Sequence, residues 1–128
     1  MAKQHLFRFG VNAIGSASGA EWRVTARKVE DLGYSVLSVQ DHLWTQLAPL
    51  TSLITAAEVT SKLRLGSLVF GNDFRHPVIL AREAATIDLL SDGRLELGMG
   101  TGYARDDYES TGVPFDPAGI RVNRKSVV

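Results

Sequence analysis

Four apolar runs in this sequence each end in a polar or glycine-containing turn, and helical patterns separate consecutive runs. This alternation predicts parallel strands joined by helices, because consecutive parallel strands need a long crossover connection that a helix commonly supplies. The carboxyl ends of such strands share one edge of the sheet, where functional groups gather. The four turns are therefore expected to surround one site: Asn12, Asp41-His42, Gly71-Asn72 and Thr101-Gly102.

The apolar spacing places the elements along the chain. Trp22, Ala26 and Val29 lie on one helical stripe, and Gly33 is suited to a left-handed helix cap. The sequence predicts strands at 6–12, 35–40, 63–70 and 94–99, and helices at 20–32, from Pro49 onward and at 76–90. The remainder, 100–128, is predicted to be mainly loop with a short helix near 105–110.

The composition excludes several classes of function. Fourteen basic residues balance fourteen acidic ones, so no basic field favours nucleic acid or an anionic membrane as a partner. The absence of cysteine excludes disulfides, thiolate metal sites and a cysteine nucleophile. No apolar run approaches the roughly 18 residues of a membrane span, and the first residues lack a signal-peptide core. We therefore expect a cytoplasmic protein that acts on a small molecule, without a metal.

Asp41, His42 and Trp44 follow the second predicted strand. A carboxylate beside an imidazole can orient a proton donor or bind the edge of a polar ring. The alternative is a loop pair that satisfies backbone groups. Trp44 is suited either to stacking on a flat ligand or to closing the mouth of the fold.

Glycine is concentrated in the next two turns. Gly71-Asn72-Asp73 allows either close approach of a ligand or a simple strand-to-helix turn. The cluster 98–102 (GMGTG) allows a backbone that contacts a planar ring or phosphate, or tight packing inside a barrel. His76 is interpreted as structural. The charged run Arg105, Asp106, Asp107 and Glu109 is interpreted as a solvated face, since it lacks metal-ligand spacing.

The segments 33–44, 64–103 and 107–121 together resemble the luciferase-like monooxygenase superfamily, especially its actinobacterial members that use coenzyme F420. The resemblance implies a TIM (β/α)8 barrel with F420, or alternatively FMN, across the carboxyl ends of the strands. It implies a catalytic role for His42 and Asp41, with Asp41 orienting His42, and a substrate pocket walled by Trp44. The implied cofactor-binding residues are Asn12, Asp41, Gly71, Asn72, Thr101, Gly102 and Tyr103.

Two details of that resemblance concern particular positions. Family members often have a non-proline cis peptide after the third strand, and Gly71-Asn72 is expected to occupy that place. The sugar-phosphate dehydrogenase branch has a catalytic glutamate after the Thr-Gly of the fourth turn. Tyr103 stands there instead, which argues against that activity.

The length of the chain sets a further expectation, because a complete TIM barrel needs about 250 residues. We expect 1–124 to form the N-terminal half of such a barrel, followed by a divergent end at 125–128 that resembles a truncation. Four parallel strands leave two edges and an apolar face uncovered, so a homodimer that completes the half-barrel is expected. The alternatives to a truncated oxidoreductase are a non-catalytic paralogue that binds a ligand or partner, and a fragment of a longer enzyme.

Overall fold

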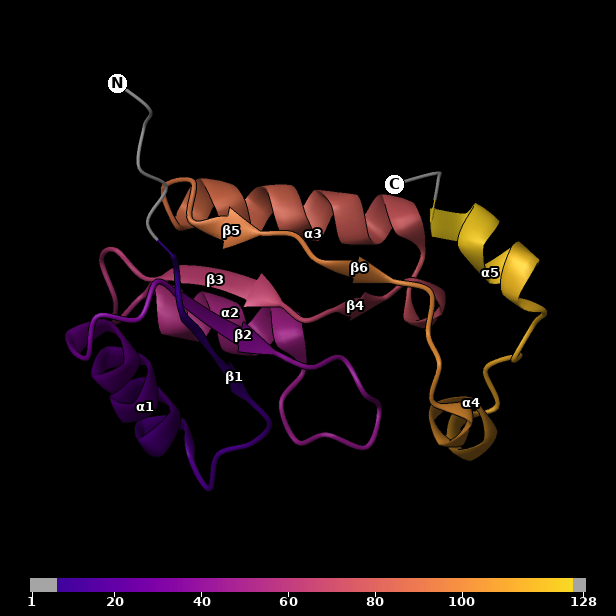
Figure 1. The fold of residues 1–128 in the computed structure, drawn as a ribbon, viewed down its shortest axis with the longest axis horizontal. Coiled ribbons are helices and arrows are strands. Elements are labelled where there is room, and N and C mark those ends of the chain that lie inside the picture. Colours follow the sequence, from indigo (N-terminus) through magenta and orange to yellow (C-terminus); the bar gives the residue numbers. More distant parts are fainter. Residues whose placement is uncertain (1–6, 126–128) are drawn as a thin grey trace.

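Four parallel strands form the central sheet of the computed structural model, which describes residues 7–125 (Figure 1). They are hydrogen-bonded in the order β1 (Gly10–Ala13), β2 (Val36–Val39), β3 (Arg64–Ser67) and β5 (Leu95–Glu96). A second parallel pair, β4 (Phe70–Gly71) and β6 (Met99–Gly100), continues beyond the ends of β3 and β5. The predicted parallel α/β architecture is confirmed.

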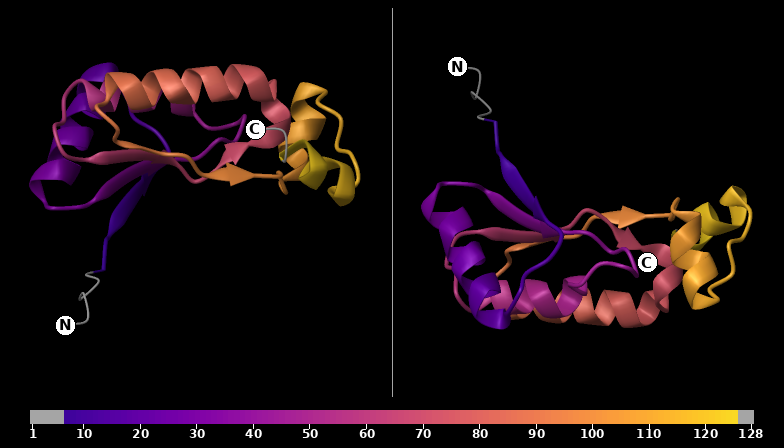
Figure 2. Two further views of the ribbon diagram at one scale, coloured as in Figure 1. Left: turned by 90° about the horizontal axis from the view of Figure 1, so that it is seen from above. Right: turned by 90° about the horizontal axis from the view of Figure 1, so that it is seen from below.

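Three helices cover one face of this sheet (Figure 2): α1 (Gly19–Asp31), α2 (Pro49–Ala57) and α3 (Pro77–Leu90). The predicted stripe of α1 is buried, and it consists of Trp22, Ala26 and Val29. They belong to one core with Leu37 of β2 and Leu65 of β3, both fully buried. The core therefore lies between the sheet and the helices, where burial of apolar area stabilises the fold.

Local chemistry sets where these helices begin and end. The side chain of Ser18 accepts a hydrogen bond from the backbone N–H of Glu21 and caps α1. Gly33 follows α1 with a φ of +80°, as predicted for a left-handed position. His76 Nδ1 accepts from the backbone N–H of Val78 at the start of α3, which agrees with the structural interpretation of this residue.

The third and fourth predicted strands are each divided in two. The cis peptide bond lies between Leu68 and Val69, at the break between β3 and β4, so the expected position at Gly71-Asn72 was wrong. Asn72 instead begins a 3₁₀ helix, η1 (Asn72–Phe74). The apolar run 63–70 continues through the break, and for this reason the sequence pattern does not reveal it.

The last part of the chain is more helical than predicted. The expected short helix is α4 (Arg105–Thr111), which Gly112 ends at a φ of +76°. A further helix, α5 (Ala118–Lys125), occupies a segment that we predicted to be loop. Arg121 of α5 is buried against the rest of the fold, where it donates to the carbonyl oxygen of Thr101. This tertiary contact explains a helix that the glycine- and proline-rich sequence does not suggest. Residues 126–128 of the predicted divergent end lie outside the described residues.

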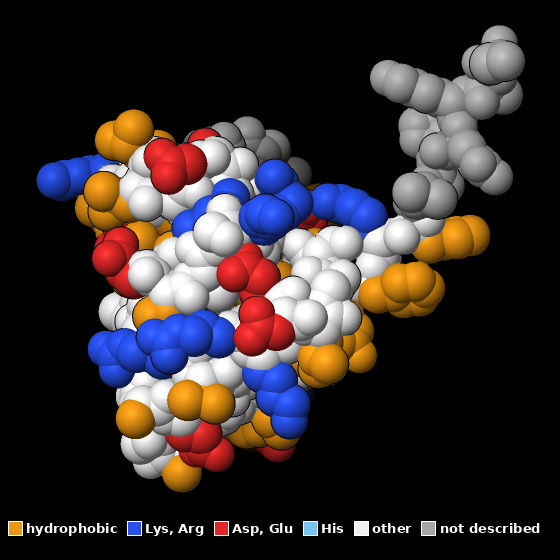
Figure 3. Space-filling view, turned by 90° about the vertical axis from the view of Figure 1, so that its left-hand side faces the viewer, with side chains coloured by type: hydrophobic (Ala, Val, Ile, Leu, Met, Phe, Trp, Pro, Cys, Tyr) orange, Lys and Arg blue, Asp and Glu red, His pale blue; other side chains and the backbone are white. Residues whose placement is uncertain are grey.

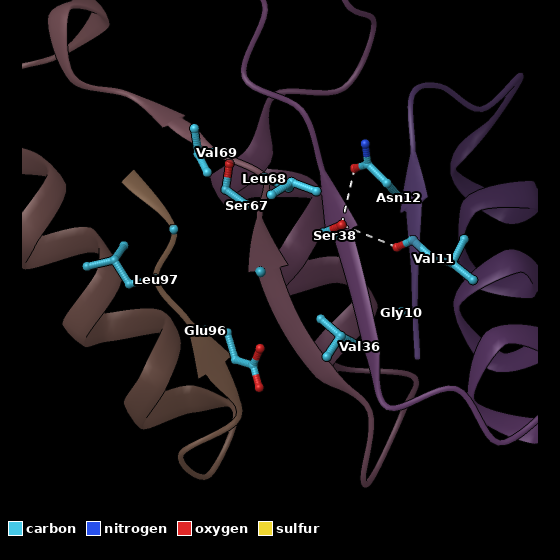
Figure 4. A pocket seen from close by; sticks show the side chains of 12 residues that line it. Gly10, Val11, Asn12, Val36, Ser38, Ser67, Leu68, Val69, Glu96 and Leu97 are labelled. Atoms are coloured by element: carbon cyan, nitrogen blue, oxygen red, sulfur yellow. Dashed lines mark hydrogen bonds between the residues drawn. The ribbon is translucent and has the colours of Figure 1, made fainter. Parts of the chain in front are cut away.

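The face of the sheet away from the helices is open, as in half of a barrel (Figure 2). A hollow of about 480 Å³ lies on it, lined by residues such as Gly10, Val36 and Leu97 (Figure 4). Glu96 stands on this face and pairs with Arg8 and Arg64. Burial by itself would raise the pKa of Glu96, but the hydrogen bonds from these two guanidinium groups bring it below its usual value.

Among residues 7–125, no helix has the length and the apolar character needed to cross a bilayer. The end of the sheet where the strands begin carries Lys and Arg interspersed with Asp and Glu (Figure 3). Hydrophobic side chains gather toward the right-hand edge of that view.

Candidate functional site

A second hollow, of about 320 Å³, lies at the carboxyl ends of the strands. Its volume is at the lower end of the roughly 300–1,000 Å³ that ligand pockets occupy. Three of the four predicted turns contribute to its wall, and so does the cis-peptide segment. The lining residues are Gln40, Asp41, His42, Leu68, Val69, Gly71, Phe74, Gly100, Thr101, Gly102, Tyr103 and Asp107.

Asp41 follows β2 and has a side chain that is only 4% exposed. Its carboxylate accepts the backbone N–H of Gly71 at 2.7 Å and both terminal nitrogens of Arg75, with Nη2 at 2.9 Å from Oδ1. These bonds tie the turn after β2 to the turn after β4. The expectation that Asp41 orients His42 was wrong, because this carboxylate is engaged by Gly71 and Arg75.

His42 is instead held by Asp107 of α4, 65 residues later in the chain. His42 Nδ1 lies 2.7 Å from Asp107 Oδ2, and the backbone N–H of Leu43 donates to Asp107 Oδ1 at 2.7 Å. The Asp107 side chain is 2% exposed. Our interpretation of this charged run as a solvated face was therefore wrong for Asp107, although Asp106 and Glu109 are exposed. Helix α4 thus exposes Asp106 and Glu109 to solvent and buries Asp107 against the rest of the fold.

Two aromatic rings contact the His42 imidazole from different directions. Trp44 stacks on it, with ring centroids 5.1 Å apart and an interplanar angle of 20°. Tyr103 meets it edge-on, and its hydroxyl lies 3.4 Å from His42 Nε2. Both aromatic side chains are largely exposed, and Trp44 covers the imidazole without lining the hollow. Trp44 thus stacks on a side chain of the protein itself, a contact that neither of the two uses considered for it includes.

The glycine cluster packs against neighbouring atoms of the protein. A Cβ at Gly98 would lie 2.3 Å from the carbonyl oxygen of Ser67, and a Cβ at Gly100 would lie 2.4 Å from the Val69 side chain. Gly102 has a φ of +73°, and a Cβ there would lie 1.8 Å from the Tyr108 hydroxyl. Tight packing thus accounts for these glycines, and it places the backbone of Gly100–Gly102 directly on the hollow.

Helix α5 supports this turn from behind. Arg121 Nη1 donates to the carbonyl oxygen of Thr101 at 3.0 Å, and the guanidinium lies 4.2 Å from the centroid of the Phe115 ring. Asn72 is buried on the same side, where its Nδ2 donates to the carbonyl oxygen of Arg121 at 3.4 Å. Its Oδ1 has no hydrogen-bond partner among the described residues. Asn72 does not line the hollow, so the structure places it with the supporting contacts.

Asn12 lies apart from the other predicted site residues. It lines the open-face hollow, where its Oδ1 accepts a hydrogen bond from the Ser38 hydroxyl at 3.2 Å (Figure 4). The two hollows share Leu68 and Val69 as a common wall. Three of the four predicted turns therefore line the hollow at the carboxyl ends of the strands, and the turn at Asn12 lines the adjoining hollow on the open face of the sheet.

Burial and hydrogen bonding add three residues that the sequence did not identify as parts of the site: Arg75, Asp107 and Arg121. Each acts on a group far away in the chain, and no spacing rule links the partners. A signal did exist for all three, because Arg75 falls in the segment 64–103, and Asp107 and Arg121 fall in the segment 107–121, both of which carry the family resemblance. No group of three or more potential metal-ligating side chains occurs among the described residues.

Comparisons with known proteins identify the family of this chain. The family model described as luciferase-like monooxygenase matches residues 4–122. A 4-hydroxyprotoasukamycin monooxygenase from Streptomyces nodosus subsp. asukaensis is 36% identical over 106 residues, which are 80% of this chain and 26% of that protein. A 5,10-methylenetetrahydromethanopterin reductase from Methanopyrus kandleri is 31% identical over 84% of this chain and 30% of that protein.

Solved structures show the same partial match. A coenzyme F420-dependent tetrahydromethanopterin reductase from Methanopyrus kandleri superimposes with a TM-score of 0.76 at 30% identity, over 84% of this chain and 30% of that chain. A type II Baeyer-Villiger monooxygenase component from Pseudomonas putida, in complex with FMN, shares the fold with a TM-score of 0.79 at 16% identity, over 94% and 37%. This chain thus spans less than a third of the length of the Streptomyces monooxygenase and of the Methanopyrus reductase that it matches in sequence. The match of the family model over residues 4–122 shows that the chain belongs to the luciferase-like monooxygenase family.

Proposed function

We propose that this chain contributes the ring-binding half of an oxidoreductase site that uses coenzyme F420 or FMN. The site would take the cofactor ring in the carboxyl-end hollow, beside the cis-peptide segment and the Gly100–Gly102 backbone. When bound, such a cofactor supplies hydride transfer, and the protein binds and orients it. The relatives support both cofactors, since one is named for F420 and another was solved with FMN.

The residues of the hollow fit a planar ring with one polar edge. Leu68 and Val69 offer an apolar wall, with the Leu68 residue 60% exposed. The turn at Thr101-Gly102 offers backbone groups to the same hollow, and His42 and Tyr103 offer polar atoms. His42 would hold or release a proton at Nε2 near the reacting atoms, and Asp41 would keep the Gly71 turn in place.

One observation carries the proposal: an imidazole held at Nδ1 lines a hollow whose wall also includes the apolar Leu68 and Val69 and the backbone of Gly100–Gly102. The direct test is a titration of the purified chain with FMN and with F420, followed by visible absorbance and fluorescence. We expect binding of one cofactor at tens of micromolar or tighter. If neither cofactor binds at that concentration, the proposal fails for this chain.

Replacing His42 with alanine separates binding from chemistry. We expect turnover to fall by about 10²–10⁴-fold, the usual contribution of a general acid or base, while cofactor affinity changes little. Turnover is followed through the visible band of the bound cofactor with a panel of small alcohols and aldehydes. His76→Ala is the matched control, because His76 caps α3 outside the hollow. Binding without turnover in the wild-type chain would instead identify a non-catalytic ligand-binding paralogue.

We also propose that a second copy of the chain covers the open face of the sheet. Leu68 and Leu97 expose 60% and 46% of their surface there, and no described strand pairs with the outer edge of β1 or β5. Such edges and apolar surface favour association. Light scattering at micromolar concentration should show a dimer, and Leu97→Glu should weaken it more than Leu89→Glu on α3. A monodisperse wild-type monomer would exclude the proposal.

A further inference from the structure

We propose that Asp107 is a positioning residue that fixes the tautomer of His42, with the proton on Nδ1 and the lone pair of Nε2 directed toward the hollow. The inference assigns a role to a carboxylate that does not itself have to touch a ligand. Its catalytic consequence rests on the proposed function, whereas the tautomer itself is a property of this chain alone.

The two oxygens of Asp107 have two different partners. Oδ1 accepts the backbone N–H of Leu43 at 2.7 Å, and Oδ2 lies 2.7 Å from His42 Nδ1. A carboxylate only accepts hydrogen bonds, so the second bond requires a proton on Nδ1. Because the Asp107 side chain is 2% exposed, water does not offer an equivalent partner. The carboxylate thereby fixes both the position of the turn and the protonated nitrogen of the ring.

The opposite nitrogen then faces the ligand side. A neutral imidazole with its proton on Nδ1 accepts at Nε2, and the Tyr103 hydroxyl lies 3.4 Å from that atom as a donor. Trp44 covers one face of the ring and restricts its rotation. In this arrangement Nε2 takes a proton from an O–H or N–H group of the ligand and later returns it. The N–H bond forms and breaks at Nε2 only, and Nδ1 keeps its proton throughout.

A purely structural role for Asp107 would need only its bond to Leu43. The substitution Asp107→Asn distinguishes the two roles, because asparagine has one oxygen and one amide nitrogen at these places. The fixed Leu43 N–H requires the oxygen, so the amide nitrogen must face His42 and donate to Nδ1. The ring would then carry its proton on Nε2, which is the opposite tautomer. The packing would be kept, because asparagine has nearly the same shape as aspartate.

Nitrogen-15 NMR of the histidine rings measures this directly, at a pH where the imidazoles are neutral. His5, which lies outside the described residues, is replaced by Gln to simplify the spectrum. In the wild-type background we expect His42 as the Nδ1–H tautomer. His76 provides a contrast in the same spectrum, because its Nδ1 accepts from Val78 and its proton belongs on Nε2. An Nε2–H tautomer of His42 in the wild-type background would overturn the proposal.

Three variants complete the experiment. Asp107→Asn should show His42 as the Nε2–H tautomer and should lower turnover by at least about 10²-fold with unchanged cofactor affinity. Asp107→Glu keeps two acceptor oxygens and should retain the Nδ1–H tautomer. Asp106→Asn is the matched control, since it makes the same change at an exposed neighbour on α4. An unchanged tautomer in a folded Asp107→Asn protein would refute the proposal, and the wild-type spectrum decides it if that variant does not fold.

The two proposals fail in different measurements. If the cofactors do not bind but His42 carries its proton on Nδ1, the proposed function fails and the positioning role of Asp107 stands. If a cofactor binds but the wild-type tautomer is Nε2–H, the positioning role fails and the proposed function stands.

Discussion

Charged side chains hold backbone groups at both ends of the parallel strands, but they do so in different ways. At the amino end, Glu30 accepts the backbone N–H groups of residues 61–63, and Arg94 donates to the carbonyl oxygens of Ala57 and Ser91. At the carboxyl end, Asp41 and Asp107 each accept one backbone N–H and also hold a second side chain.

This difference separates stability from function. At the amino end, the side chains of Glu30 and Arg94 bond mainly to backbone groups and are therefore not available to a ligand. The carboxyl-end carboxylates orient Arg75 and His42, and both His42 and the Gly71 turn face a hollow. The same division of the barrel into a stabilising end and a functional end is general for this architecture.

The largest effect is expected from glycine replacement at the carboxyl end. Gly102→Ala combines a left-handed φ of +73° with a Cβ only 1.8 Å from the Tyr108 hydroxyl, which is buried and bonded to Asp73. We expect a loss of about 3–5 kcal/mol in the free energy of unfolding. Gly33→Ala has a similar φ of +80° but no atom within 4 Å, so it should cost only about 1–2 kcal/mol.

Urea denaturation of both variants measures the difference. Gly119→Ala in α5 is a further control, because no atom lies within 4 Å of its Cβ position and its φ is not left-handed. Equal losses for Gly102→Ala and Gly33→Ala would mean that the Tyr108 contact does not constrain the carboxyl-end turn.

Arginine replacement tests whether the two ends differ in function at similar stability. Arg75→Met leaves the nearly buried Asp41 without its cationic partner, and we expect a loss of about 2–4 kcal/mol. Arg94→Met leaves carbonyl oxygens of the amino end without a donor, and a similar loss of about 2–4 kcal/mol is expected.

Only the carboxyl-end variant should alter the site. Arg75→Met should also lower turnover of the folded protein about tenfold or more, because the Gly71 turn is displaced. Chemical denaturation and turnover are measured on the same preparations. The contrast between the two ends is refuted if Arg94→Met lowers turnover as much as Arg75→Met does.

The sequence predicted the order of the elements because apolar periodicity is a local property. The helices that pack on the sheet and the positions of Asp41 and His42 after β2 follow from it. The break at Leu68-Val69 was not predicted, because the apolar run crosses it without a signal. Helix α5 was not predicted either, since buried Arg121 and its contacts with the Thr101 turn stabilise it across about 20 residues of chain.

The partners within the site were the least predictable part. Asp107 looks like one member of a charged run, and only the fold shows that it is buried against His42. Asp41 and His42 are neighbours in sequence, but their side chains have different partners on different elements. Adjacency in the chain thus suggested a contact between Asp41 and His42 that the fold does not make.

The smallest predicted effect concerns the amino end and its dependence on pH. Burial by itself would raise the pKa of Glu30, but the backbone N–H groups of Lys62, Leu63 and Ser61, and the charge of Arg94, bring it below its usual value near 4.5. A carboxyl whose pKa is lowered by folding stabilises the native state above its unfolded pKa. That stabilisation is lost as the pH falls from about 4.5 through the folded pKa.

We therefore expect Glu30→Gln to be less stable than the wild type at neutral pH, by about 1 kcal/mol or less because Glu30 is partly exposed to solvent. The difference between the two proteins should shrink as the pH is lowered below about 4.5, in urea titrations at a series of pH values. Glu58→Gln changes an exposed carboxyl at the end of α2 and should run parallel to the wild type. A constant difference between Glu30→Gln and the wild type across this range would show that the Glu30 bonds do not depend on its charge. The amino end would then be held by hydrogen bonds and packing that do not need the charge of Glu30, and the contrast with the carboxyl end, where charge orients the site, would be sharper than we propose.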